Sequence, residues 1–91
     1  MLYLARYYNK SKYKKKEVIY STPTCHFCNL AKEFFTTHNI PFTSFDVSTD
    51  REKQAEILEK TGRMGVPVIL IDDEVIVGFD ESRIRQALNI Q

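Results

Sequence analysis

The sequence predicts an α/β domain in which helices pack on a small mixed sheet, in the order β-α-β-α-β-β-α. Strand-like and helix-like stretches alternate along residues 17–91, and turn-forming residues stand at nearly every junction. The run VPVILI at residues 66–71 is apolar throughout, which is typical of a central strand covered on both faces. With 91 residues, of which 43% are hydrophobic, the chain has room for one core but not for a second lobe.

The first strand and helix are expected around the only two cysteines of the chain. Residues 18–20 favour a strand, and the serine, threonines and proline of residues 21–24 end it and favour a helix N-cap. Asn39 and Pro41 mark the end of the helix. The helix carries an apolar stripe of five residues at spacings of three and four: Phe27, Leu30, Ala31, Phe34 and Phe35. We interpret its three phenylalanines as core residues.

A second strand and helix are expected between residues 42 and 62. Residues 42–47 have the aromatic and β-branched content of a strand. Thr49 with Glu52 three residues later forms a capping-box pattern, which predicts the start of a helix. Gly62 is the residue at which this helix should end.

The last three elements complete the sheet. Pro67 falls at the beginning of the strand at residues 66–71, where a missing N–H is tolerated. Asp72 and Asp73 form a polar break before the strand at residues 74–77, which suggests a hairpin, and Gly78 and Phe79 close that strand. Asp80 is then expected to N-cap a final helix whose inward face carries Ile84, Ala87 and Leu88.

The charge is distributed unevenly along the chain. Residues 1–16 hold six of the 13 basic residues and none of the 12 acidic ones, so their formal charge is +6 and that of residues 17–91 is −5. We therefore expect a basic N-terminal arm, residues 1–16, joined to a domain at residues 17–91. The arm could dock on an acidic partner, a nucleic acid or an anionic membrane, or it could be a solvated tail or a helical extension of the body. Of these partners we do not favour nucleic acid, and we expect a monomer.

Several classes of protein are excluded by the composition. No apolar run approaches the roughly 20 residues that a membrane span requires, and none of the glycine-rich loops that bind phosphates is present. The five residues at the N-terminus are too short for the apolar region of a secretory signal, and the positive charges follow them. We expect a cytoplasmic protein, in which an isolated thiol pair would be kept mostly reduced.

Cys25 and Cys28 are the candidate catalytic residues. They stand three residues apart at the start of the first helix, so their side chains project to the same side and can close a disulfide. The helix N-terminus stabilises negative charge, which should lower the pKa of Cys25 from the free value of about 8.5 and make it a nucleophile. Cys28, deeper in the helix, is placed to attack a mixed disulfide formed at Cys25.

The residues near the cysteines allow other interpretations. His26, when protonated, could stabilise the Cys25 thiolate, or it could be a solvent-facing side chain that is mostly neutral at pH 7. The cysteines could instead be inert core thiols or part of a metal site. The remaining histidine, His38, lies ten residues beyond Cys28, so the spacing that is typical of a structural zinc site is missing, and we expect no metal.

Three blocks of sequence, in order, resemble the glutaredoxin family. They read YSTPTCHFC at residues 20–28, TGRMGVPV at residues 61–68 and VGFD at residues 77–80, and the similarity is closest to the short bacterial glutaredoxin-like proteins. The resemblance covers residues 17–91. It implies a thioredoxin fold, with a four-stranded mixed sheet flanked by three helices. It also implies a thiol-disulfide oxidoreductase that reduces protein or glutathione mixed disulfides through the Cys25–Cys28 pair.

The resemblance also implies a binding site around the cysteines. Val66 and Pro67 correspond to the family's cis-proline pair, at which the Val66 backbone is offered to an extended thiol substrate. No tightly bound cofactor is implied, and glutathione is the implied co-substrate. The residues that would contact glutathione or a disulfide substrate are Thr22, Thr24, His26, Phe27, Val66, Pro67, Gly78, Phe79 and Asp80.

The chain departs from the glutaredoxin pattern at residues that bear on its electron donor. Thr22 stands where many members have a lysine, Phe79 where they have a second glycine, and His26-Phe27 replaces a common Pro-Tyr. The Gly78-Phe79 pairing is similar to the redoxins that take electrons from thioredoxin reductase. The expected partners are therefore disulfide-containing proteins or glutathione, with glutathione or thioredoxin reductase as donor. The alternative hypothesis, from another functional class, is that the chain is not an enzyme of this kind but a module that binds a metal or an iron-sulfur cluster with glutathione.

Overall fold

The computed structural model describes residues 17–90, and its elements follow the predicted order β-α-β-α-β-β-α. The basic arm expected at residues 1–16 lies outside the described residues. In chain order the elements are β1 (Glu17–Ser21), α2 (His26–Thr37), β2 (Thr43–Asp46), α3 (Arg51–Thr61), β3 (Val68–Ile71), β4 (Glu74–Val77) and α4 (Glu81–Leu88).

The four strands form one mixed sheet in the order β2-β1-β3-β4. β1 pairs in parallel with β2 and antiparallel with β3, and β3 pairs antiparallel with β4. β3 therefore lies inside the sheet, as its apolar run predicts, and Val68, Ile69 and Ile71 are at most 2% exposed. The predicted thioredoxin-like arrangement, a four-stranded mixed sheet with three helices, is confirmed for the described residues.

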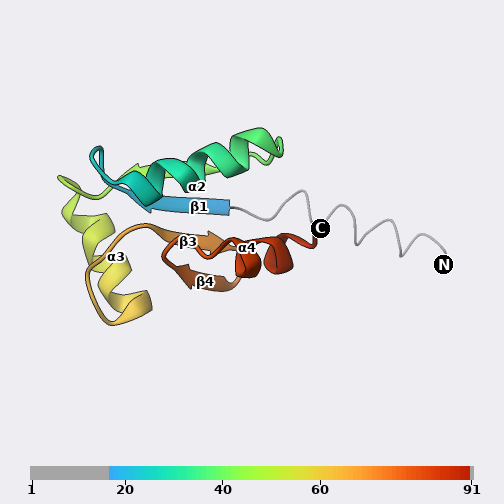
Figure 1. Cartoon of the computed structure of the whole chain (residues 1–91). Coiled ribbons are helices and arrows are strands. Elements are labelled where there is room, and N and C mark those ends of the chain that lie inside the picture. Colours follow the sequence, from blue (N-terminus) through green and yellow to red (C-terminus); the bar gives the residue numbers. More distant parts are fainter. Residues whose placement is uncertain (1–16, 91) are drawn as a thin grey trace, which may run out of the picture.

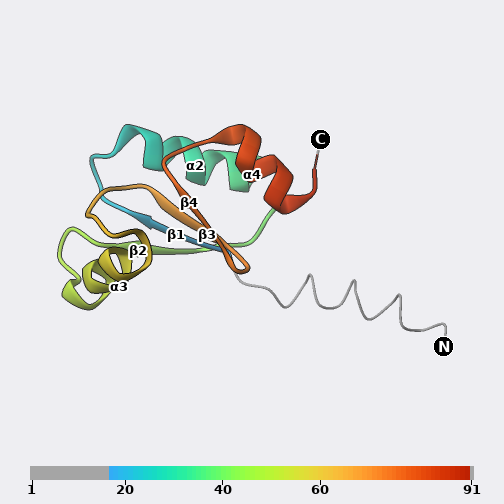
Figure 2. The same ribbon diagram turned by 90° about the horizontal axis from the view of Figure 1, so that it is seen from below.

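The helices cover both faces of the sheet (Figures 1 and 2). Figure 2 shows α2 and α4 side by side over one face and α3 against the other. The larger core lies under α2 and α4 and includes Phe35, Ile69 and Ile84, none of which is exposed. The smaller core lies under α3 and is built around Tyr20 and Ile57.

Most ends of the elements are fixed by the residues that the sequence indicates, but the N-cap of α2 is Cys25 and not one of residues 21–24, because its Sγ accepts a hydrogen bond from the N–H of Cys28. Asp80 Oδ1 accepts a hydrogen bond from the N–H of Arg83 and caps α4, and Gly62 ends α3 in the left-handed region at φ 83°. The hairpin is confirmed, since Ile71 pairs with Glu74 across the two aspartates. The expected capping box of Thr49 is wrong, because the side chain of Asp50 accepts from the N–H of Lys53 and begins α3 one residue later.

The prediction that Phe27 belongs to the core is also wrong. Its side chain is 57% exposed, and Leu30 is only half-buried. The face of α2 that meets the sheet is formed by Cys28, Ala31, Phe34 and Phe35. Phe27 lies in the first turn, one turn before Ala31 on the same side of the helix, and it belongs to neither hydrophobic core.

Candidate active site

The two cysteines lie where β1 gives way to α2, and they form a disulfide. Cys25 is the N-cap of α2, and its Sγ accepts a hydrogen bond from the N–H of Cys28 at 3.1 Å. Their Cα atoms are 5.2 Å apart. Cys28 is completely buried against the sheet, whereas Cys25 is partly exposed. Of the two cysteines, only Cys25 is therefore accessible to an approaching molecule.

The loop before the cysteines is a short turn that presents Cys25 at the helix N-terminus. The N–H of Cys25 donates to the carbonyl of Thr22 at 3.3 Å, and the N–H of Asn29 donates to the carbonyl of Cys25 at 3.2 Å. Thr22 is half-buried and Thr24 is exposed. The side-chain Sγ of Cys25 thus replaces the oxygen that normally caps a helix, and it meets one of the free N–H groups of the first turn.

The register of the sheet brings the three sequence blocks to one end of it. Tyr20, near the end of β1, pairs with Val68 at the beginning of β3, and Val68 pairs with Val77 at the end of β4. The chain that leaves β1 for the cysteines, the chain that enters β3 and the chain that leaves β4 consequently share this end. The predicted site residues of all three blocks are therefore neighbours.

Val66 and Pro67 are joined by a cis peptide bond, as the resemblance implies. Pro67 is fully buried and Val66 is half-buried. The carbonyl of Pro67 accepts a hydrogen bond from the N–H of Gly78 at 2.9 Å, and Gly78 has a φ of 87°, in the region that favours glycine. The second and third blocks are thus bonded directly to each other.

The remaining residues of the predicted site lie on both sides of this junction. Phe79 is half-buried and packs edge-to-face on Phe34 of α2, with ring centroids 6.2 Å apart, while Asp80 is exposed and its carboxylate caps α4. His26 and Phe27 are exposed beside the cysteines, with their rings edge-to-face at 5.4 Å. The side chain of Phe79 is therefore anchored on the helix that carries both cysteines.

A polar cluster that the sequence did not indicate supports the sheet behind the site. The hydroxyl of Tyr20 donates to Glu56 Oε1 at 2.8 Å, linking β1 to α3, and Lys53 pairs with the other oxygen at 3.1 Å. Burial, followed by this hydrogen bond, raises the pKa of Tyr20 to about 12, and the Tyr20 and Lys53 hydrogen bonds lower the pKa of Glu56. Tyr20 and Glu56 are 36 residues apart, so no local pattern pairs them.

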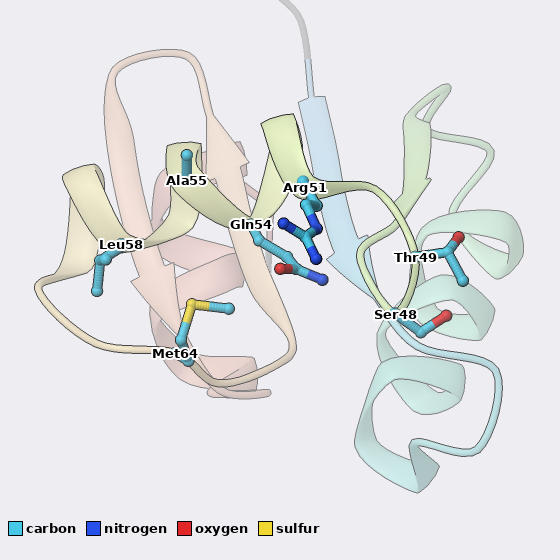
Figure 3. Close-up of a pocket in the computed structure, with 7 residues that line it drawn as sticks. All are labelled: Ser48, Thr49, Arg51, Gln54, Ala55, Leu58 and Met64. Carbon is cyan, nitrogen blue, oxygen red and sulfur yellow. The ribbon is translucent and has the colours of Figure 1, made fainter.

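Sequence reasoning also missed a groove of about 630 Å³ beside α3, which we call the α3 groove (Figure 3). One half is apolar and the other polar, and none of its residues was among the predicted site residues. Long-range packing forms the groove, because it lies between α3 and the loop that leads to Val66. Its lining residues are Ser48, Thr49, Arg51, Gln54, Ala55, Leu58 and Met64.

Within residues 17–90, no three or more histidine, cysteine, aspartate or glutamate side chains gather into a group that could hold a metal ion. None of the helices in this described part is long and apolar enough to cross a membrane.

Known proteins resemble this chain in sequence and in structure. A family model described as Glutaredoxin matches residues 18–76. An uncharacterized glutaredoxin-like 8.6 kDa protein from the rubredoxin operon of Clostridium pasteurianum is 42% identical over 70 residues, which cover 77% of this chain and 93% of the relative. Glutaredoxin 3 of Escherichia coli K12 is 32% identical over 63 residues, 69% of this chain and 76% of the relative. The crystal structure of a thioredoxin-like protein superposes with a TM-score of 0.75 at 32% identity, covering 80% of this chain and all of that one.

Proposed function

Since this chain belongs to the glutaredoxin family and is a thiol-disulfide oxidoreductase, we propose that Cys25 is its attacking thiol and Cys28 its resolving thiol. The single observation that carries this assignment is the difference in burial. Cys25 is partly exposed at the helix N-terminus and Cys28 is completely buried. The free N–H groups and the dipole of the helix favour a thiolate at Cys25, and only the accessible sulfur can meet a substrate disulfide.

The reaction proceeds by two exchanges in which electrons and atoms balance. The thiolate of Cys25 attacks one sulfur of the substrate disulfide, so that a mixed disulfide forms and the first substrate thiolate leaves and takes up a proton. The thiolate of Cys28 then attacks the sulfur of Cys25, and the second substrate thiolate leaves. The substrate has gained two electrons, and the protein is left with the Cys25–Cys28 disulfide, the form in which the structure has it.

The substrates are protein disulfides or mixed disulfides with glutathione, and the cis-proline segment supports binding them. The backbone of a half-buried Val66 lies at the same end of the sheet as Cys25. An extended chain that carries the reacting cysteine would pair with this backbone. Gly78 and Asp80 lie on the other side of Pro67 and would complete the site. We place this activity in the cytosol, where a dithiol of this kind is kept reduced.

Re-reduction of the disulfide needs two electrons from a thiol donor, and two donors are in question. Two glutathione molecules would serve a glutaredoxin in the usual sense. Thioredoxin reductase, through its own dithiol, is the second candidate. It is favoured by Phe79, whose ring is packed on Phe34 where glutathione-using members have a glycine, and by the uncharged Thr22.

The test is NADPH consumption with hydroxyethyl disulfide as substrate, run with glutathione plus glutathione reductase and, separately, with thioredoxin reductase. Turnover in the first assay identifies glutathione as the donor, and turnover in the second identifies the reductase. Cys25→Ser is the control and is expected to abolish turnover in either. Activity that survives Cys25→Ser, or no activity in both assays, would overturn the dithiol mechanism.

A further inference from the structure

The α3 groove has an apolar half that is open to solvent. Leu58 is 50% exposed and Met64 is 53% exposed, and they are two of the four large hydrophobic side chains that are exposed within residues 17–90. Ala55, one turn before Leu58 on α3, completes this half. Figure 3 shows Met64 extending from the loop toward α3 below Gln54. Covering two such side chains with an apolar group would be favourable.

The polar half of the groove carries one charge, and that charge is positive. Arg51 is its only ionisable lining residue, and Arg51 forms no ion pair with any residue in the described part of the chain. The amide of Gln54 donates from Nε2 to the carbonyl of Val47 at 2.7 Å, so its position is fixed. Figure 3 shows the guanidinium of Arg51 beside this amide. A carboxylate brought to this half would meet an unpaired cation.

The groove opens at the end of the sheet that holds the cysteines. Ser48, on its wall, follows Val47, whose N–H donates to the carbonyl of Ser21 at 2.9 Å. Met64, on the opposite wall, stands two residues before Val66. A chain that pairs with Val66 while its cysteine reacts at Cys25 would thus continue into the groove.

We infer that the α3 groove receives an extended segment of the protein whose disulfide is reduced. A large apolar side chain of this segment lies between Leu58 and Met64, and an acidic side chain pairs with Arg51. Glutathione offers a carboxylate but no large apolar side chain, so the apolar half favours a protein segment. This inference rests on the proposed function, because the segment is held by its cysteine at Cys25.

The test uses peptides that carry one cysteine as a mixed disulfide with mercaptoethanol, and the full-length chain. Leu or Ser, and independently Glu or Gln, are placed two to four residues to either side of the cysteine. For the wild-type protein we expect kcat/KM to be about threefold to tenfold higher with Leu than with Ser, and about threefold higher with Glu than with Gln. Arg51→Gln should remove the preference for Glu, and Met64→Ser the preference for Leu.

Lys60→Gln is the matched control, because Lys60 is an exposed cation on the same helix that does not line the groove. It should keep both preferences. Equal kcat/KM for all peptides with the wild-type protein, or preferences that persist in Arg51→Gln and Met64→Ser, would overturn the inference. The inference would also be overturned if Arg51→Gln lowered kcat/KM as much with glutathione disulfide as with the Glu peptides, since the groove would then bind glutathione. Failure of the wild-type protein to reduce hydroxyethyl disulfide would instead count against the proposed function.

Discussion

The N–H of Gly78 donates a hydrogen bond to the carbonyl of Pro67 at 2.9 Å, and this bond joins the end of β4 to the cis-proline segment. Gly78 makes it with a φ of 87°, which L side chains rarely adopt. The two segments that the proposed site needs beside the cysteines are thereby held in one arrangement. The same bond places Phe79, the next residue, against α2.

Gly78→Ala should lower the free energy of unfolding by about 1 kcal/mol, because alanine is strained at this φ even though a Cβ there would meet no atom within 4 Å. Urea denaturation measures the loss. Gly65→Ala is the matched control, since a Cβ at Gly65 is equally unobstructed and its φ lies outside the left-handed region. Equal losses in both variants would show that backbone conformation is not the cause.

Phe79→Gly should lower the free energy of unfolding by about 2 kcal/mol, because the ring packs on Phe34 and the larger core. If the ring excludes glutathione, the same variant should turn over faster with glutathione plus glutathione reductase than the wild-type protein does. Phe79→Leu keeps most of the packing and serves as the control. A Phe79→Gly variant with unchanged glutathione-dependent turnover would contradict the role of Phe79 in donor choice.

Asp80→Ala should destabilise the protein by about 1 kcal/mol through loss of the bond from the N–H of Arg83 that begins α4. Asp80→Asn keeps a capping side chain and removes the charge, so its stability should be close to that of the wild-type protein. Thermal unfolding separates the two variants. If the charge of Asp80 also binds substrate, KM should rise in both, and a KM that rises only in Asp80→Ala would assign the effect to the cap.

Tyr20→Phe should lower the free energy of unfolding by about 1 to 2 kcal/mol, since Glu56 loses the hydrogen bond that the Tyr20 hydroxyl donates. The pH dependence has a definite sign. The folded-state pKa of Tyr20 is raised from 10.0 to about 12, so the unfolded chain releases this proton first, and the contribution to stability that is complete below pH 10 is lost as the pH rises toward 12. Denaturation at several pH values should show this decline in the wild-type protein and a smaller one in Tyr20→Phe.

Cys28→Ser should accumulate a mixed disulfide at Cys25, because the first exchange still occurs and the second has no nucleophile. Mass spectrometry after exposure to glutathione disulfide would show one added glutathione per chain. Cys25→Ser should show almost none, since Cys28 is completely buried. Equal labelling of the two variants would contradict the assignment of attacking and resolving thiols.

Much of the fold follows from local patterns. The apolar run at residues 66–71 predicts an inner strand and β3 is one, although its paired part begins only at Val68. Asp80 begins α4 and Gly62 ends α3, as expected, because capping depends on a few neighbouring residues. α3 starts one residue later than the capping-box pattern predicts, since Thr49 and Asp50 both suit an N-cap and the sequence does not rank them.

Burial on α2 was harder to predict. An apolar stripe indicates which residues share a face, but not how far the sheet extends beneath it. Phe27 belongs to the stripe by spacing, four residues before the buried Ala31, and yet it is 57% exposed, because it lies in the first turn of α2, outside the larger core. Only the packed structure distinguishes it from Phe35, which is fully buried.

The sequence by itself determined the Cys25–Cys28 pair, the order of the elements and, through its three blocks, the family. These depend on short spacings and on the periodicity of apolar residues, which are local properties. The tertiary structure alone decided that Tyr20 bonds Glu56, that Phe79 packs on Phe34 and that Arg51 and Met64 line one groove. Each of these contacts joins segments that are distant in the chain, and the register of the sheet and the packing of helices on its two faces, not local propensity, bring such segments together.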